Sequence, residues 1–219
     1  MKSSVIIFPG SNCDRDMDVA LKKFGFQNKM IWHNDQSIPK SDLIVLPGGF
    51  SYGDYLRCGS IASKSKIIDP IIKFAKSGGL VIGICNGFQI LTESGLLKGC
   101  LLRNSNLNFI CKNQRLNVVS KDSIFTKGFE VHQNIKLPIA HQDGNYHVSK
   151  KDLTFLEEEN LIAFRYINNP NGSTNDIAGI LSSNRRVLGM MPHPERATPS
   201  KSPLRHGSLI FKSLLDSFK

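Results

Sequence analysis

Cys85 lies in the segment whose residue types and spacing best suit covalent chemistry. The apolar run at residues 80–84 ends in Gly83-Ile84-Cys85-Asn86-Gly87, and a helical pattern follows. This spacing matches the nucleophile elbow G-x-S-x-G, with cysteine in the place of serine. Glycines suit such an elbow because the turn is tight and the nucleophile has a strained backbone. The segment predicts a cysteine nucleophile, although a cysteine after a buried strand is more often an inert apolar side chain.

His193 is the best candidate for the base, among six histidines in the chain. The start of a helix favours the thiolate form of Cys85, but nucleophilic catalysis also needs a base that a third group holds. His193 follows a predicted strand, and Glu195 lies two residues further on, where an extended chain points both side chains to the same side. Pro192 and Pro194 stiffen this segment. Alone it could be an exposed turn, but together with the elbow it predicts a Cys85–His193–Glu195 catalytic triad.

Two backbone N–H groups are expected to form an oxyanion hole beside Cys85. The elbow supplies the first, from Asn86. The turn Pro47-Gly48-Gly49-Phe50 follows another predicted strand, and we expect its Gly49 to supply the second, because glycine permits close approach and unusual φ angles. An ordinary tight turn explains the sequence of this segment equally well.

Several kinds of site are not expected, because their motifs do not occur in the sequence. Neither G-x-x-x-x-G-K-[ST] nor G-x-G-x-x-G is found, so no nucleotide cofactor is expected on this chain. The five cysteines form no C-x-x-C pair, which predicts no metal site and no disulfide framework, and fits the cytoplasm. The first residues enter a strand pattern rather than a signal peptide, and no apolar run reaches the roughly 18 residues of a membrane span.

The formal net charge is +10, from 28 basic and 18 acidic residues. Such a charge could attract an anionic partner. However, no basic run is longer than a pair, and aromatic residues do not interleave with the basic ones. We therefore expect a solvated lysine-rich surface and no nucleic-acid partner.

Apolar runs alternate with amphipathic stretches in the first half of the chain. This alternation predicts a parallel sheet with helices on both faces. The predicted strands are residues 5–8, 43–46 and 80–84, and the predicted helices are residues 14–24, 67–76 and 88–94. Reactive groups gather at the carboxyl ends of the strands in such sheets, so the loops after these strands are the candidate functional loops.

The second half is richer in short strands. They are predicted at residues 108–111, 116–119, 135–139, 161–166, 177–181 and 187–191, and a helix over residues 206–218 closes the chain. No linker rich in proline, glycine and serine divides the sequence. We therefore predict a single α/β domain over residues 1–219, flavodoxin-like, with a mostly parallel central sheet and additional strands in its C-terminal half.

At this point the motifs resemble those of class I, or triad-type, glutamine amidotransferases. The elbow from Gly83 to Gln89 and the segment His193-Pro194-Glu195 carry this resemblance. Other segments are similar to the glutaminase subunits of phosphoribosylformylglycinamidine synthases, and they cover nearly the whole chain. These segments are residues 8–14, 47–57, 138–144, 164–166, 169–173, 177–180 and 189–196. In one departure, Gln142-Asp143-Gly144 stands where the family often has Gly-Glu-Gly.

The resemblance implies a thioester mechanism for glutamine hydrolysis. The Cys85 thiolate would attack the side-chain amide carbon of glutamine, and His193, oriented by Glu195, would move the protons. Water would then hydrolyse the glutamyl thioester. Gln89 and His141 are the candidate substrate-binding residues, although Gln89 could also be a polar residue on a helix surface. Tyr52, Arg57 and again His141 are candidates for the glutamine pocket or a subunit interface.

The resemblance also implies partners. Ammonia would pass to a separate, large synthetase subunit that uses ATP, with Mg²⁺, to convert formylglycinamide ribonucleotide to its amidine in purine biosynthesis. Chains of this length also resemble those that need a small accessory subunit for assembly. This chain itself is expected to bind glutamine and to hold no cofactor and no metal.

Three other interpretations compete with this one. The chain could be a glutaminase that serves tryptophan, folate or GMP synthesis, but Phe50-Ser51-Tyr52-Gly53-Asp54 and residues 190–196 count against it. A cysteine hydrolase or chaperone with the DJ-1-like fold resembles a cysteine followed directly by histidine, whereas Asn86 follows Cys85. An inactive binding module that kept the fold is disfavoured because all three triad residues are present.

Overall fold

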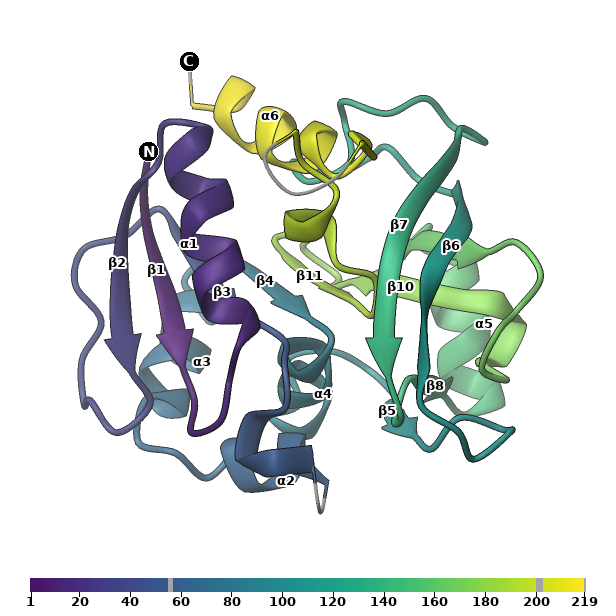
Figure 1. Cartoon of the computed structure of the whole chain (residues 1–219), viewed down its shortest axis with the longest axis horizontal. Coiled ribbons are helices and arrows are strands. Elements are labelled where there is room, and N and C mark those ends of the chain that lie inside the picture. Colours follow the sequence, from purple (N-terminus) through teal and green to yellow (C-terminus); the bar gives the residue numbers. More distant parts are fainter. Residues whose placement is uncertain (55–56, 200–202, 219) are drawn as a thin grey trace.

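Five parallel strands bring the candidate loops to one edge of a nine-stranded sheet. The computed structural model describes residues 1–54, 57–199 and 203–218. The five strands lie in the order β2-β1-β3-β4-β11, and β3 and β4 are buried along their whole length. Helices cover both faces of this part, which explains its continuous apolar runs (Figure 1). The strands are β1 (Lys2–Ile7), β2 (Gln27–Trp32), β3 (Leu43–Leu46), β4 (Leu80–Ile84) and β11 (Val187–Met190).

The rest of the sheet is antiparallel, and it extends from β11 in the order β10-β9-β6-β7. A separate two-stranded sheet pairs β5 with β8. The prediction of a mostly parallel core with additional strands in the C-terminal half is therefore confirmed. These strands are β5 (Cys100–Leu102), β6 (Ile110–Val118), β7 (Asn134–His141), β8 (Asn145–His147), β9 (Ile162–Tyr166) and β10 (Ile177–Leu181).

Helix α1 lies in front of the parallel strands in Figure 1, and α3 and α4 lie behind them. Helix α4 follows β4 directly, so the turn between them opens at the carboxyl edge of the sheet. Short 3-10 turns span Ser51–Asp54, Thr174–Asp176 and Pro194–Arg196. The helices are α1 (Cys13–Lys23), α2 (Cys58–Ala62), α3 (Ile68–Lys76), α4 (Asn86–Glu93), α5 (Lys150–Glu158) and α6 (Ser208–Asp216).

One prediction of secondary structure is wrong. Residues 108–111 and 116–119 are not two strands, because β6 runs without a break from Ile110 to Val118. The polar residues 112–115 interrupt the apolar pattern, yet they lie in a continuous antiparallel ladder with β7. Backbone pairing therefore carries the strand through a stretch in which side-chain burial gives only a weak signal.

Five other helices and strands of the described residues have no counterpart among the predicted ones. Strand β2 lies at the edge of the sheet and has one buried residue, Ile31, so its sequence shows little apolar pattern. Helix α5 likewise buries only Leu156. Helix α2 and the pair β5–β8 are too short to show a clear period.

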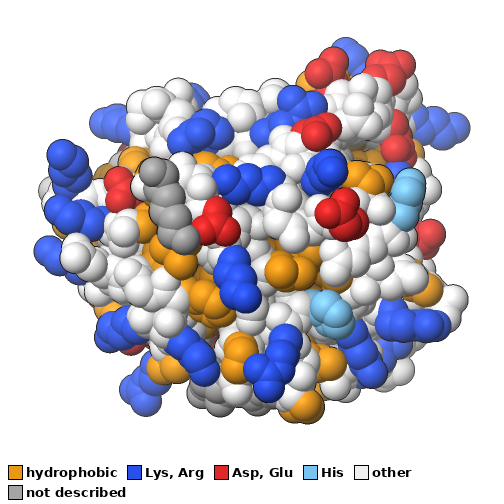
Figure 2. All heavy atoms as spheres, turned by 90° about the horizontal axis from the view of Figure 1, so that it is seen from above, with side chains coloured by type: hydrophobic (Ala, Val, Ile, Leu, Met, Phe, Trp, Pro, Cys, Tyr) orange, Lys and Arg blue, Asp and Glu red, His pale blue; other side chains and the backbone are white. Residues whose placement is uncertain are grey.

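The basic residues are spread over the face of the molecule that Figure 2 shows. Figure 2 looks onto the face that lies uppermost in Figure 1, and it shows Lys and Arg side chains scattered among acidic and apolar ones. Within the described residues, no helix combines the length and the apolar character needed to cross a membrane.

Candidate active site

Cys85 occupies a strained turn between β4 and α4. Its φ of 53° and ψ of −107° place a non-glycine residue in the left-handed half of backbone space, which costs about 1–3 kcal/mol. The Cys85 N–H donates to the Met190 carbonyl at 2.8 Å, so β11 holds this turn in place. Cys85 immediately precedes α4, so its thiol lies at the first turn of this helix. The elbow geometry predicted for Cys85 is therefore present.

His193 and Glu195 form a buried pair just beyond β11. The two side chains are 1% and 0% exposed, and His193 Nδ1 lies 2.7 Å from Glu195 Oε1. The His193 N–H donates to the carbonyl of Pro138 at 2.8 Å, which fixes the backbone from the side of β7. Burial alone would lower the pKa of His193, but the Glu195 carboxylate and two neighbouring thiols, of Cys13 and Cys85, raise it well above its ordinary value. The imidazole is thus held ready to carry a positive charge.

The structure brings Cys85 and His193 together beside Gly48. A methyl group built on Gly48 would lie 2.8 Å from Cβ of Cys85 and 2.9 Å from Cε1 of His193. Because β4 and β11 are parallel neighbours, their carboxyl ends place both residues at the same edge of the sheet. The three members of the predicted triad therefore lie together, and their catalytic roles remain a proposal.

A small cavity of about 20 Å³ is lined by both Cys85 and His193. This volume is close to that of a single water molecule. The Cys85 thiol donates weakly to the carbonyl of Ala140, another lining residue, at 3.6 Å. Its lining residues are Asn12, Cys13, Gly49, Phe50, Asp54, Cys85, Ala140, His193 and Arg196.

The two predicted oxyanion donors border this region. Gly49 has a φ of +94°, which strongly favours glycine, and a methyl group there would lie 2.1 Å from Oδ1 of Asn12. Asn86 is the first residue of α4, where backbone N–H groups have no partner within the helix. Among the described residues, neither the Gly49 N–H nor the Asn86 N–H has a hydrogen-bond acceptor. Both are available to a developing oxyanion, and their role stays a prediction.

The loop after β1 holds the turn that carries Gly49. Ser11 Oγ donates to the Gly48 carbonyl at 3.2 Å, and the Asn12 N–H donates to the Gly49 carbonyl at 3.0 Å. In a trans peptide the C=O and the N–H point in opposite directions. Since Ser11 binds the Gly48 carbonyl, the Gly49 N–H of the same peptide points away from this loop. The sequence motif at residues 8–14 does not by itself indicate this role of Ser11.

We expect Ser11→Ala to lower kcat for glutamine hydrolysis by about 10-fold with little change in KM. The loss is smaller than the 10²- to 10³-fold cost of removing an oxyanion donor, because the donor remains and only its orientation is released. Ser11→Thr should restore kcat, since it keeps the hydroxyl group. Steady-state kinetics of these variants test this role. Ser63→Ala is the control, because it removes a part-buried hydrogen bond to the Ser60 carbonyl three residues earlier. A rise in KM with an unchanged kcat would assign Ser11 to glutamine binding instead.

The Asn86 side chain ties the elbow to the short turn at Ser51–Asp54. Its Oδ1 accepts from the Ser51 N–H at 3.0 Å, and its Nδ2 donates to Asp54 Oδ1 and Gln89 Oε1, each at 3.0 Å. The elbow motif predicts a role only for the backbone N–H of Asn86. The side chain therefore has a positioning role that the motif alone did not indicate.

Gln89 and His141 lie near Cys85, but neither lines the small cavity. The amide of Gln89 donates to the Asp143 carbonyl at 2.7 Å and accepts from the Cys58 thiol at 2.6 Å. His141 Nδ1 bonds to Asn104 at 3.0 Å, while its buried Nε2 has no partner in the described part of the chain. Burial and the charge of His193 lower the pKa of His141 to about 3, so it is neutral near pH 7. Substrate binding by both residues stays a prediction.

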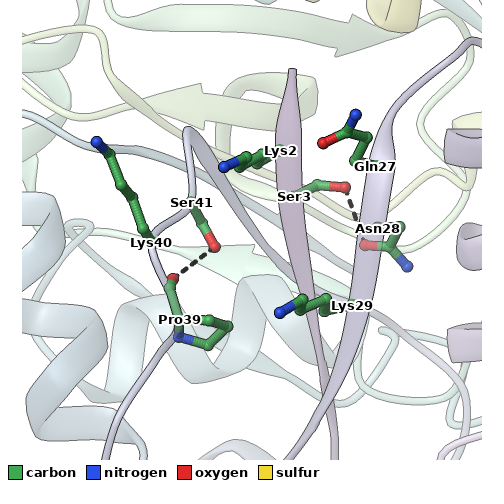
Figure 3. A pocket seen from close by; sticks show the side chains of 8 residues that line it. All are labelled: Lys2, Ser3, Gln27, Asn28, Lys29, Pro39, Lys40 and Ser41. Carbon is green, nitrogen blue, oxygen red and sulfur yellow. Dashed lines mark hydrogen bonds between the residues drawn. The ribbon is translucent and has the colours of Figure 1, made fainter.

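A larger cavity, of about 280 Å³, lies at the other end of the sheet (Figure 3). It lies beside the amino ends of β1 and β2, whereas ligand sites of parallel sheets occur at the carboxyl ends. Three lysines, Lys2, Lys29 and Lys40, border it, but all are exposed. The chemistry of Cys85 and His193 therefore belongs to the smaller cavity.

With this geometry in place, comparisons with known proteins identify the family. The sequence profile of the CobB/CobQ-like glutamine amidotransferase domain matches residues 1–203. The phosphoribosylformylglycinamidine synthase subunit PurQ of Pelagibacter ubique (strain HTCC1062) is 55% identical, over 100% of both chains. This chain belongs to that family of glutamine amidotransferase subunits. The corresponding subunit of Ruegeria sp. (strain TM1040) is 52% identical, over 98% of this chain and 97% of its own.

Solved structures agree with this assignment. The structure of PurLQS from Thermotoga maritima contains a chain that superimposes with a TM-score of 0.91 at 44% identity, covering 100% of this chain and 99% of that chain. The glutaminase domain of CTPS from Trypanosoma brucei shares the fold, with a TM-score of 0.65 at 13% identity, covering 99% of this chain and 94% of its own. The resemblance seen in the sequence is therefore confirmed.

Two residues of the segment at 47–57 make contacts away from the small cavity. The Tyr52 hydroxyl bonds to His33 Nδ1 at 3.2 Å and to Ser65 Oγ at 3.1 Å. Arg57 forms an ion pair with Glu93 of α4. Residues 55 and 56 of this segment lie outside the described residues. Tyr52 thus braces the segment against the loop after β2, while Arg57 remains a candidate for a subunit interface.

Proposed function

We propose that this chain releases ammonia from glutamine at Cys85 and supplies it to a synthetase that makes formylglycinamidine ribonucleotide. One observation carries the proposal: a thiol in a strained elbow lies beside a buried imidazole–carboxylate pair, in a chain that a PurQ subunit matches over its full length. In this pair, Nδ1 of His193 and Oε1 of Glu195 are 2.7 Å apart. A thiol, a base and an orienting carboxylate are the parts that acyl transfer through a thioester requires.

The reaction begins when the Cys85 thiolate attacks the side-chain amide carbon of glutamine. The tetrahedral intermediate places its negative oxygen where the Gly49 and Asn86 N–H groups can donate to it. The imidazolium of His193 gives its proton to the leaving nitrogen, and ammonia departs as the C–N bond breaks. His193 then takes a proton from water, which attacks the thioester and releases glutamate and the thiol. Glu195 holds Nδ1 throughout, so that Nε2 serves these transfers.

The small cavity at Cys85 is the place where the side-chain amide of glutamine would meet the thiol. The carbonyl of Asp143 and the neutral imidazole of His141 lie next to this region, and with Gln89 they are the polar groups we assign to substrate. All three groups are uncharged, and so is the side-chain amide of glutamine that they would contact.

The ammonia acceptor belongs to partner chains in this proposal. A synthetase subunit would bind ATP and Mg²⁺ and aminate formylglycinamide ribonucleotide, and a small accessory subunit would assist assembly. The solved assembly called PurLQS contains the similar Thermotoga maritima chain, which supports such a partnership. The absence of nucleotide motifs from this chain agrees with it. We place the complex in the cytoplasm.

Isotope transfer from glutamine tests the proposal. The chain is combined with its synthetase partners, ATP, Mg²⁺ and formylglycinamide ribonucleotide, with glutamine labelled by ¹⁵N at the side-chain amide. We expect label in the amidine product and one glutamate per product, as measured by mass spectrometry. If label enters only a different acceptor, the assignment of the pathway is wrong. If no glutamate forms while free ammonia still supports the product, the glutaminase assignment is wrong.

A further inference from the structure

Asp54 brings an acidic side chain to the catalytic cavity, and the glutaminase mechanism gives it no task. It lines the small cavity together with Cys85 and His193. Among the described residues that line this cavity, Asp54 alone has a carboxyl group. Hydrolysis of an amide needs a thiol, a base, an orienting carboxylate and oxyanion donors, and other residues supply all of these. The position of Asp54 therefore calls for a separate explanation.

The residue that follows the nucleophile fixes the side chain of Asp54. Asn86 Nδ2 donates to Asp54 Oδ1 at 3.0 Å, and Asn86 Oδ1 accepts from the N–H of Ser51 at the start of the same short turn, also at 3.0 Å. The φ of Asp54 is 55°, in the left-handed region that Gly, Asn and Asp tolerate better than other residues. The carboxylate therefore has a defined place next to the elbow.

In the described part of the chain, no basic side chain forms an ion pair with Asp54. One arginine, Arg196, also lines the cavity, but its Nε lies 3.1 Å from Asp16 Oδ2. Two arginines of neighbouring segments are likewise paired with other carboxylates, Arg57 with Glu93 and Arg103 with Asp143. The carboxylate of Asp54 is therefore left for a cation that these residues do not supply.

The described groups that interact with Asp54 are themselves neutral or acidic. The amide of Asn86 is neutral, and burial together with the charge of Asp54 raises the pKa of the Cys58 thiol, so this thiol stays protonated near pH 7. Burial and the charge of Asp54 also raise the pKa of the Asp143 carboxyl. Since a nearby like charge has this effect, Asp143 adds to the negative potential around Asp54. A positively charged group bound there would be stabilised by both side chains.

We propose that Asp54 binds the α-ammonium group of glutamine, and that this contact makes the site select an amino acid over a simple carboxamide. The ammonium is the only positive group of glutamine, and a charge-assisted hydrogen bond to a carboxylate is a strong contact for it. A short carbon chain joins the ammonium to the reacting amide, so one end of the substrate meets Cys85 while the other meets Asp54. This inference rests on the proposed function, because it concerns the substrate of the same site.

A substrate without the ammonium group tests this contact. Glutaramate has the carboxylate and the side-chain amide of glutamine, but a hydrogen atom replaces its α-ammonium group. With the wild-type chain, its synthetase partners, ATP and formylglycinamide ribonucleotide, kcat/KM for amidine formation should be about 10- to 100-fold higher with glutamine, because glutaramate lacks a hydrogen bond between charged groups. Asp54→Asn should lower kcat/KM for glutamine by about 10- to 100-fold and leave that for glutaramate unchanged.

Asp54→Asn removes the charge and little else. The new amide oxygen can still accept from Asn86, and asparagine tolerates the positive φ. Asp122→Asn, at an exposed carboxyl group, is the matched control and should discriminate between the two substrates as the wild type does. If Asp54→Asn alters folding, as judged by circular dichroism, Asp54→Gly replaces it, because glycine also adopts this φ. Comparing the two substrates cancels any loss that is common to both.

The outcomes separate recognition of the ammonium from other roles of Asp54. If the variant loses the same factor with both substrates, Asp54 only positions the elbow through Asn86, and the proposal is overturned. It is also overturned if the variant uses both substrates as the wild type does. If the wild-type complex releases no glutamate from glutamine, the proposed function fails, and this inference fails with it.

Equilibrium binding to the inactive Cys85→Ala complex gives a second measurement, which does not depend on turnover. Adding Asp54→Asn to this complex should weaken the binding of glutamine by about 10- to 100-fold, as measured by calorimetry, and should leave the binding of glutaramate unchanged. Glutamine binding that is equally tight with and without the Asp54 carboxylate would overturn the proposal.

Discussion

Cys85→Ala is expected to abolish glutamine-dependent turnover, by about 10⁴-fold or more, because covalent catalysis loses its nucleophile. The N–H groups of Gly49 and Asn86 would remain, but water alone is a poor nucleophile toward an amide. The variant should fold normally, since alanine fits the space of the 4%-exposed thiol and keeps the same backbone geometry. Glutamate release, followed with the synthetase partners present, is the measurement.

Ammonia-dependent turnover provides the internal control for this variant. If Cys85 acts only in hydrolysis, an excess of ammonium salt should restore amidine formation in the Cys85→Ala complex to the wild-type level. Cys100→Ala, which removes a partly exposed thiol on β5, should leave both activities unchanged. Substantial glutamate release by Cys85→Ala would mean that the nucleophile lies elsewhere. Loss of the ammonia-dependent activity would instead indicate a damaged subunit interface.

Much of the parallel half of the fold could be predicted from sequence, because its strands are buried on both faces. The boundaries of β3 and β4 agree with the predicted ranges, since every residue in these strands is apolar or glycine and buried. Elements at the edges of the sheet were harder to predict from the sequence. Strand β2 pairs through its backbone with only one neighbour and buries a single residue, so its formation depends on β1 rather than on its own pattern.

The site could be predicted in part for a similar reason. Elbow residues such as Cys85 are close in sequence to the strand that positions them, so a local motif is sufficient. Pairing of His193 with Glu195 is also local. Cys13 reaches the site from the other end of the chain, because β1 and β11 lie in the same sheet and end at the same edge. No local pattern distinguishes its thiol from an inert core cysteine.

The largest effect outside the nucleophile is expected for Glu195→Gln, which should lower kcat/KM for glutamine by up to about 10⁴-fold. The carboxylate fixes Nδ1 of His193 at 2.7 Å and supplies the charge that raises the pKa of the imidazole. In the variant, burial still lowers the pKa of His193, but the carboxylate charge no longer raises it, so the pKa falls. The imidazolium that protonates the departing ammonia is then lost at lower pH than in the wild type.

The pH profile of Glu195→Gln separates this electrostatic role from a purely structural one. A general acid is lost as the pH rises through its pKa, so the basic limb of kcat/KM should move to lower pH in the variant. Glu130→Gln removes a carboxylate from an exposed ion pair with Lys121 and should leave both the rate and the profile unchanged. A reduced rate with the wild-type profile would show that Glu195 only supports the shape of the site. Because the carboxylate is fully buried against the imidazole, we expect its charge to account for most of the effect.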